Sequence, residues 1–142
     1  MRTGDFPRAA HTLIRFDPTT GPFIQAYRCG ACGAVTTEQT MACRRCAVRA
    51  APQPFRTTTH GQVHGWTVVE RSFPGVAVPF ISVIVDLEGG PTVKGTLRGV
   101  NPDAMRGALP VTLVFDDADG AADAHGLTYV GFHFVPQQAV HE

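Results

Sequence analysis

Residues 61–135 show the alternation of hydrophobic and polar positions that is typical of β-strands. Five segments are predicted to be strands because they are rich in β-branched and aromatic residues; the first alternates imperfectly, and the second is apolar on both faces. They are GQVHGWTVVERS (61–72), FISVIVDL (80–87), TVKGTLRG (92–99), VTLVFDD (111–117) and LTYVGFHFV (127–135). Turns containing Gly or Pro separate them, so the second part of the chain is predicted to be all β.

One short helical turn is predicted between the third and fourth strands. In NPDAMRG (101–107), Asn101 is suited to be the N-cap and Pro102 the first helical residue. Three strands, a helical turn and two strands are the elements of a five-stranded Greek-key barrel of the OB type. A small β-sandwich is the competing architecture. The positions expected to point inward are Ile81, Val83, Val85, Leu87, Val93, Leu97, Val111, Leu113 and Phe115.

The first part of the chain has a weaker pattern. FPRAAHTLIRF (6–16) is a weak candidate for a helix, which DPTTGPF (17–23) would end. The two prolines of AVRAAPQPF (47–55) indicate a connector. We therefore expect an N-terminal segment with a small module in residues 1–55, and a barrel with a C-terminal tail in residues 56–142.

All four cysteines lie in CGACGAVTTEQTMACRRC (29–46), as two CxxC pairs separated by ten residues. Each CxxC turn brings two sulfur atoms to one ion, and two turns complete a tetrahedral shell. The sequence therefore predicts a rubredoxin-like zinc ribbon with Cys29, Cys32, Cys43 and Cys46 as ligands of one structural Zn²⁺. Iron is the rival metal, because the same ligands serve it. Four protein ligands leave no open position for catalysis.

Charged residues are unevenly distributed along the chain, although the formal net charge is zero. Residues 1–60 carry eight arginines and three acidic residues, whereas residues 61–142 carry four basic and nine acidic residues. Four arginines close to the cysteines either balance the charge of the thiolates or form a basic surface for a phosphate or an acidic partner. They are Arg28, Arg44, Arg45 and Arg49.

The composition is globular, with 44% hydrophobic and 17% charged residues. No apolar run is long enough for a membrane span, and the N-terminus lacks the pattern of a signal peptide, so we expect a cytoplasmic protein without a membrane partner. No cysteine is free to act as a nucleophile once metal is bound. The histidines His60, His64, His125 and His133 are isolated, and Asp116, Asp117 and Asp119 suit a solvated turn. We do not expect an enzyme that acts alone.

A ribbon beside an OB barrel also suggests binding of single-stranded nucleic acid. The predicted barrel is acidic, however, and lacks the basic path that such binding needs. Tyr129, Phe132 and Phe134 could stack on bases, but aromatic residues in a last strand are more often core. Nucleic-acid binding is therefore the alternative function.

The order of parts resembles a family of acyl-CoA-associated proteins with a zinc ribbon and an OB fold, formerly catalogued as a domain of unknown function. The resemblance covers roughly residues 23–136. It is carried by AYRCGACG, ACRRC, HGQVHGWTVV, FPGVAVPF, ISVIVDLEGG, GVNPDAMRGALPVTLVF and YVGFHFVP. Only the four cysteines transfer residue by residue, as metal ligands. The N-terminal helical lead usual in the family is short here.

The resemblance implies a non-catalytic accessory subunit in a hetero-oligomer with a thiolase-superfamily enzyme. The partner would be an aldolase-type carbon–carbon lyase or an acyltransferase of lipid or steroid side-chain catabolism. The accessory subunit would help to bind the acyl-CoA substrate. Arg44 and Arg45 would lie near the phosphates of coenzyme A. Phe73 and Phe80, in FPGVAVPF (73–80), would offer apolar contacts to acyl-CoA or the partner, unless that loop packs under its own barrel.

Overall fold

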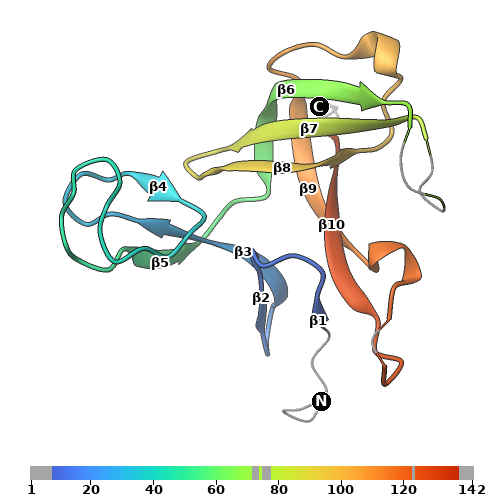
Figure 1. Cartoon of the computed structure of the whole chain (residues 1–142). Coiled ribbons are helices and arrows are strands. Elements are labelled where there is room, and N and C mark those ends of the chain that lie inside the picture. The colour runs from blue at the N-terminus through green and yellow to red at the C-terminus, as the bar shows by residue number, and fades with distance from the viewer. Residues whose placement is uncertain (1–7, 72–73, 75–77, 123, 138–142) are drawn as a thin grey trace, which may run out of the picture. The chain divides into compact units, whose positions relative to one another are not determined.

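A computed structural model gives the fold and describes residues 8–71, 74, 78–122 and 124–137. Contacts divide the chain into two compact units. The first contains Met1–Thr58, Gly89–Pro91 and Asp117–Gly131, and the second contains Thr59–Glu88, Thr92–Asp116 and Phe132–Glu142. In the described residues, the secondary structure consists of strands and two short 3₁₀ turns, so the prediction of a mainly β protein is confirmed (Figure 1).

The first unit is built around β3 (Gly21–Arg28). This strand pairs in antiparallel fashion with three others, and its last two residues, Tyr27 and Arg28, have a strand on both sides. The three are β2 (Ile14–Asp17), β4 (Val35–Thr36) and β5 (Gln53–Arg56). The buried side chains of this unit are Ile14, Ile24, Ala26, Tyr27, Cys29, Pro52 and Pro91. The short β1 (Arg8–Ala9) pairs in parallel with the first residues of β10 (Tyr129–Pro136).

The expected helix in residues 6–16 is wrong for the residues that the structure describes, where β1 and β2 lie instead. β2 and β3 form a hairpin in which Ile14 is opposite Ile24, and both are buried. The Asp17 carboxylate closes the turn by accepting hydrogen bonds from the N–H groups of Thr19 and Thr20. These bonds lower the pKa of Asp17, with a smaller contribution from the Arg56 guanidinium. Burial across the hairpin outweighs a weak helical preference.

The connector expected near residues 50–55 is partly a strand. Residues 53–56 form β5, which pairs with residues 25–28 of β3. Pro54 is tolerated because β5 has only one neighbouring strand. Arg28 covers the Phe55 ring at 4.4 Å, and Arg56 covers Phe23 at 4.1 Å. The division between residues 55 and 56 stays a prediction.

The second unit contains the predicted OB barrel, which is confirmed. Its strands follow the order β10–β8–β7–β6–β9, and β9 pairs again with β10, so the sheet closes on itself. They are β6 (His60–Val69), β7 (Phe80–Leu87), β8 (Thr92–Leu97), β9 (Pro110–Asp116) and β10. The closing pair β8 and β10 is parallel, with Leu97 opposite Phe134.

The helical turn lies where the sequence places it, between β8 and β9. Pro102–Ala104 forms one 3₁₀ turn, and the Asn101 side chain accepts a hydrogen bond from the N–H of Asp103. The barrel core also follows the predicted alternation. Eight of the nine expected inward positions are buried, and only Phe115 is of intermediate exposure. Val63 and Phe134 are buried as well.

The long strand β6 has different neighbours along its two halves. β7 pairs with it from Gly61 to Val69, with a bulge between Val63 and Gly65. β9 pairs only with residues 60–62. Val63 then exchanges hydrogen bonds of 2.9 Å with the backbone of Leu109 and Ala108. The bulge lets the strand bend around the barrel.

Candidate metal centre

The first CxxC turn starts where β3 ends. Cys29 directly follows Arg28, and its carbonyl oxygen accepts a hydrogen bond of 2.9 Å from the N–H of Gly33. The N–H of Cys29 in turn donates to the carbonyl oxygen of Ala34 at 2.9 Å. These two bonds fold the six-residue segment 29–34 into a tight knuckle.

The second CxxC turn repeats these bonds. The N–H of Ala47 donates to the carbonyl oxygen of Cys43 at 2.8 Å, and the N–H of Cys43 donates to the carbonyl oxygen of Val48 at 2.9 Å. Gly33 and Ala47 occupy the same place in the two turns, and both have positive φ angles, 76° and 65°. The two knuckles therefore have the same backbone design.

The two knuckles bring all four sulfur atoms together, within 4.8 Å of one another. Cys29 Sγ lies 3.7 Å from Cys46 Sγ, and Cys32 Sγ lies 3.6 Å from Cys43 Sγ. Thiolates about 2.3 Å from a tetrahedral ion are separated by about 3.8 Å. A disulfide requires about 2.05 Å. The cluster therefore fits a structural zinc site, as the sequence predicts.

Backbone N–H groups favour the thiolate form of the first cysteine in each pair. The N–H groups of Cys46 and Arg45 each lie 3.4 Å from Cys43 Sγ, and they lower the pKa of Cys43 to about 6. The N–H groups of Cys32 and Ala31 likewise lower the pKa of Cys29. Because a metal binds the thiolate, these bonds prepare the cluster for a cation.

The paired positions Gly33 and Ala47 give a matched test of backbone strain. We expect Gly33→Ala to destabilise the metal-loaded first unit and Ala47→Gly to stabilise it, each by about 1 kcal/mol, because only glycine adopts positive φ without strain. Nothing lies within 4 Å of the position that a Cβ on residue 33 would take, so crowding plays no part. Denaturant unfolding of the zinc-loaded chain measures both changes. Gly30→Ala, with neither positive φ nor crowding, is the control; equal effects of all three would contradict the strain argument.

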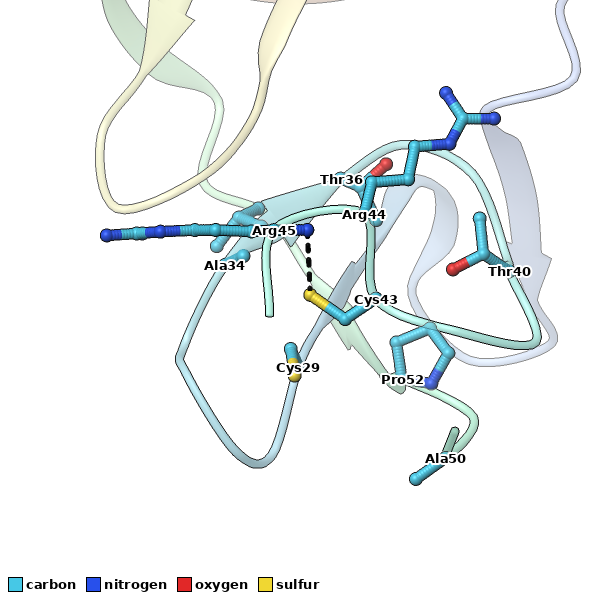
Figure 2. A pocket seen from close by; sticks show the side chains of 10 residues that line it. Cys29, Ala34, Thr36, Thr40, Cys43, Arg44, Arg45, Ala50 and Pro52 are labelled. Atoms are coloured by element: carbon cyan, nitrogen blue, oxygen red, sulfur yellow. Dashed lines mark hydrogen bonds between the residues drawn. The ribbon is translucent and has the colours of Figure 1, made fainter. Parts of the chain in front are cut away.

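A pocket of about 350 Å³ opens beside two of the sulfur atoms. Cys29 and Cys43 line it, and Figure 2 shows the side chains of Arg44 and Arg45 extending away from the two sulfur atoms. The rest of the lining consists of Ala34, Val35, Thr36, Thr40, Ala50 and Pro52. The pocket combines a mostly apolar wall with two threonine hydroxyls and two cations.

The structure distinguishes the two arginines. Arg44 forms an exposed ion pair with Glu38 at 3.0 Å, so its charge is already partly balanced. Arg45 is exposed, and no acidic side chain in the described part of the chain forms an ion pair with it. Arg45 is thus the better placed of the two to bind an anion.

Of the two phenylalanines expected at the binding surface, the structure describes only Phe80. Phe80 begins β7 in the second unit, is opposite Val69 and is of intermediate exposure. Phe73 lies outside the described residues. Val78, near the end of the same loop, keeps 43% of its surface exposed. Where this loop packs therefore stays a prediction.

Two histidines have partners that sequence reasoning missed. His133 Nδ1 lies 2.7 Å from the Asp116 carboxylate, and both side chains are largely buried. Asp116 ends β9 and so is not part of a solvated turn, which corrects that expectation. His64 Nδ1 lies 3.0 Å from Asp86, which also accepts a hydrogen bond from Thr92. The sequence holds no signal for these pairs, because their members are far apart along the chain.

The lining residues Thr36, Thr40, Ala50 and Pro52 were missed as well. They belong to β4 and to loops that become neighbours only when the knuckles fold. The spacing of the cysteines was the one signal that could have drawn attention to this region.

Comparison with known proteins identifies the barrel. Residues 57–116 match the family described as the ChsH2 C-terminal OB-fold domain. The matched segment contains β6, β7, β8 and β9 of the barrel. The resemblance seen in the sequence is therefore confirmed, and the ChsH2-type barrel follows directly after β5 of the ribbon sheet. No curated protein matches the chain.

A solved structure supports the fold over most of the chain. The match is to a chain of the Ltp2-ChsH2(DUF35) aldolase, with a TM-score of 0.62 and 24% sequence identity. It covers 80% of this chain and 84% of that one, so it extends beyond the segment that the family model matches. Among the described residues, no helix is long and apolar enough to cross a membrane.

Proposed function

We propose that this chain is a non-catalytic accessory subunit of a thiolase-superfamily enzyme and helps that enzyme to bind its acyl-CoA substrate. The partner would be an aldolase-type carbon–carbon lyase or an acyltransferase in lipid or steroid side-chain catabolism. One observation carries the proposal: a four-cysteine ribbon and a ChsH2-type barrel occur together, in a chain whose fold matches a chain of an aldolase complex.

We also propose that Cys29, Cys32, Cys43 and Cys46 bind one Zn²⁺. Its role would be structural, because four thiolates close the coordination shell. The sulfur separations support this assignment. The elemental content of the purified chain decides between zinc and iron.

The arrangement of side chains supports a role without catalysis by the chain alone. All four cysteines of the sequence belong to the cluster, so none is left to act as a nucleophile. The nucleic-acid alternative gains no support, because Phe134 is fully buried and stacks edge-to-face on Phe132 at 5.9 Å. A ring in the core is not available to stack on a base.

Co-expression with a thiolase-like subunit tests the proposed function. We expect a stable hetero-oligomer that binds acyl-CoA, and no turnover by the isolated chain. Failure to assemble with such a subunit, together with a mobility shift of single-stranded nucleic acid, would favour the alternative instead.

Arginine variants of the complex test where acyl-CoA binds. We expect Arg45→Ala to weaken binding by about tenfold or more if the partner shields the contact, since charge-assisted hydrogen bonds contribute about 1.5–3 kcal/mol. Arg44→Ala should have a smaller effect because Glu38 already pairs with Arg44. Both effects should shrink as salt is raised. Arg49→Ala, exposed but outside the pocket lining, is the control.

The loop variants are expected to act on assembly. Phe80→Ala and Phe73→Asp should reduce complex formation with little dependence on salt, because an apolar contact depends on buried area.

If neither arginine variant changes acyl-CoA binding while zinc is retained, Arg44 and Arg45 only balance the thiolates.

A further inference from the structure

The second half of β6 has one backbone edge without a partner. We call residues 65–69 (GWTVV) the β6 edge. β7 pairs with one side of this segment along its whole length. On the other side, β9 reaches only residue 62 and the segment 108–109 only Val63, and no other described residue hydrogen-bonds there. A row of backbone N–H and C=O groups is therefore left open.

The side chains of the β6 edge do not block its pairing with another strand. Trp66 keeps 40% of its surface exposed, and Thr67 is exposed as well. The segment contains no charged residue and no proline, which are the usual means of blocking an edge strand. Charged residues, Glu70 and Arg71, come only after β6 has ended. An unblocked apolar edge of this kind is a template for strand addition.

We propose that the β6 edge docks an extended segment of the partner subunit, which adds to the barrel as a further strand. This rests on the proposed function, because the partner is the thiolase-like enzyme named above. Only another extended chain has backbone groups at the spacing needed to satisfy an open ladder. Five residues span roughly 17 Å, the length of an average strand. Trp66 would supply the apolar anchor beside the ladder.

Hydrogen exchange of the wild-type chain tests the backbone part of the proposal. In the free chain we expect fast exchange at alternate amides of residues 65–69, whose N–H groups face the open edge. In the complex with the thiolase-like subunit, those amides should become protected. Unchanged exchange in an assembled complex overturns the proposal, and protection in a dimer of the free chain assigns the edge to a second copy instead.

Two variants and a matched control test the side chains. We expect Trp66→Lys or Thr67→Lys to weaken assembly by about tenfold or more, because each places a charge in the docked edge. Ile84→Lys is the control, since Ile84 is 41% exposed but lies on β7, which has a strand on both sides. Equal assembly by all three variants overturns the proposal. If the wild-type chain assembles with no thiolase-like subunit, the proposed function fails, and this inference fails with it.

Discussion

Replacement of Cys43 by serine is expected to abolish zinc binding and to unfold the first unit. The metal would contribute about 10–16 kcal/mol to a module of this kind, which is comparable to the whole stability of a typical small domain. Among the residues that the structure describes, the sheet and knuckles of the first unit hold only five buried hydrophobic residues, and one of them is a cysteine of the cluster. A core of that size does not compensate for loss of the ion.

Elemental analysis and amide exchange measure this outcome together. The wild-type chain should contain one zinc per chain and Cys43→Ser none, with loss of protection along β3. Met41→Ser is the control, because Met41 lies between the two CxxC pairs but is 90% exposed. The single tryptophan, Trp66, lies in the barrel and should report that the second unit remains folded. A Cys43→Ser chain with a protected ribbon and no metal would show that the ion does not hold the module together.

The barrel could be predicted because the local sequence of each strand is enough to indicate a strand. Alternation in residues 80–87 and 111–115 reflects one face buried in a closed sheet, and the Asn101 cap depends on residues next to it in sequence. The same holds for the metal cluster, since CxxC spacing is a local property. Such features are predictable where local preference and tertiary structure agree.

The first unit was harder to predict because long-range pairing decides it. Ile14 becomes strand only because Ile24 lies opposite to it, and residues 53–56 become strand only because β3 has a free side. Ala47 shows the same limit within the site. Its positive φ is imposed by the second knuckle, and alanine gives no sign of such a conformation in a sequence.

Removal of the Phe134 ring should cause the largest loss of stability in the barrel. Phe134 is fully buried on β10, beside the parallel pairing with β8 that closes the sheet. Phe134→Ala is expected to lower the free energy of unfolding by about 3–5 kcal/mol, because it leaves a cavity that surrounding strands fill only partly. Denaturant unfolding followed by Trp66 fluorescence measures the change. Val114→Ala, at a 37% exposed position of β9, is the control and should cost far less.

The close contact between Gly95 on β8 and the Phe134 ring gives a test of this explanation. If the loss of stability in Phe134→Ala comes from the vacated space, a larger residue at position 95 should partly fill that space. A Cβ at residue 95 would lie 2.7 Å from Phe134 Cε2, so glycine is required while the ring is present. Gly95→Ala alone should therefore destabilise the barrel by about 1–3 kcal/mol through overpacking. In the Phe134→Ala background the same change should cost less, because the methyl group enters the vacated space and only Phe132 Cε2, at 3.2 Å, remains close to it. The two substitutions should thus couple strongly in a double-mutant cycle. Additive effects would show that glycine is needed at residue 95 for its backbone conformation and not to leave room for the Phe134 ring.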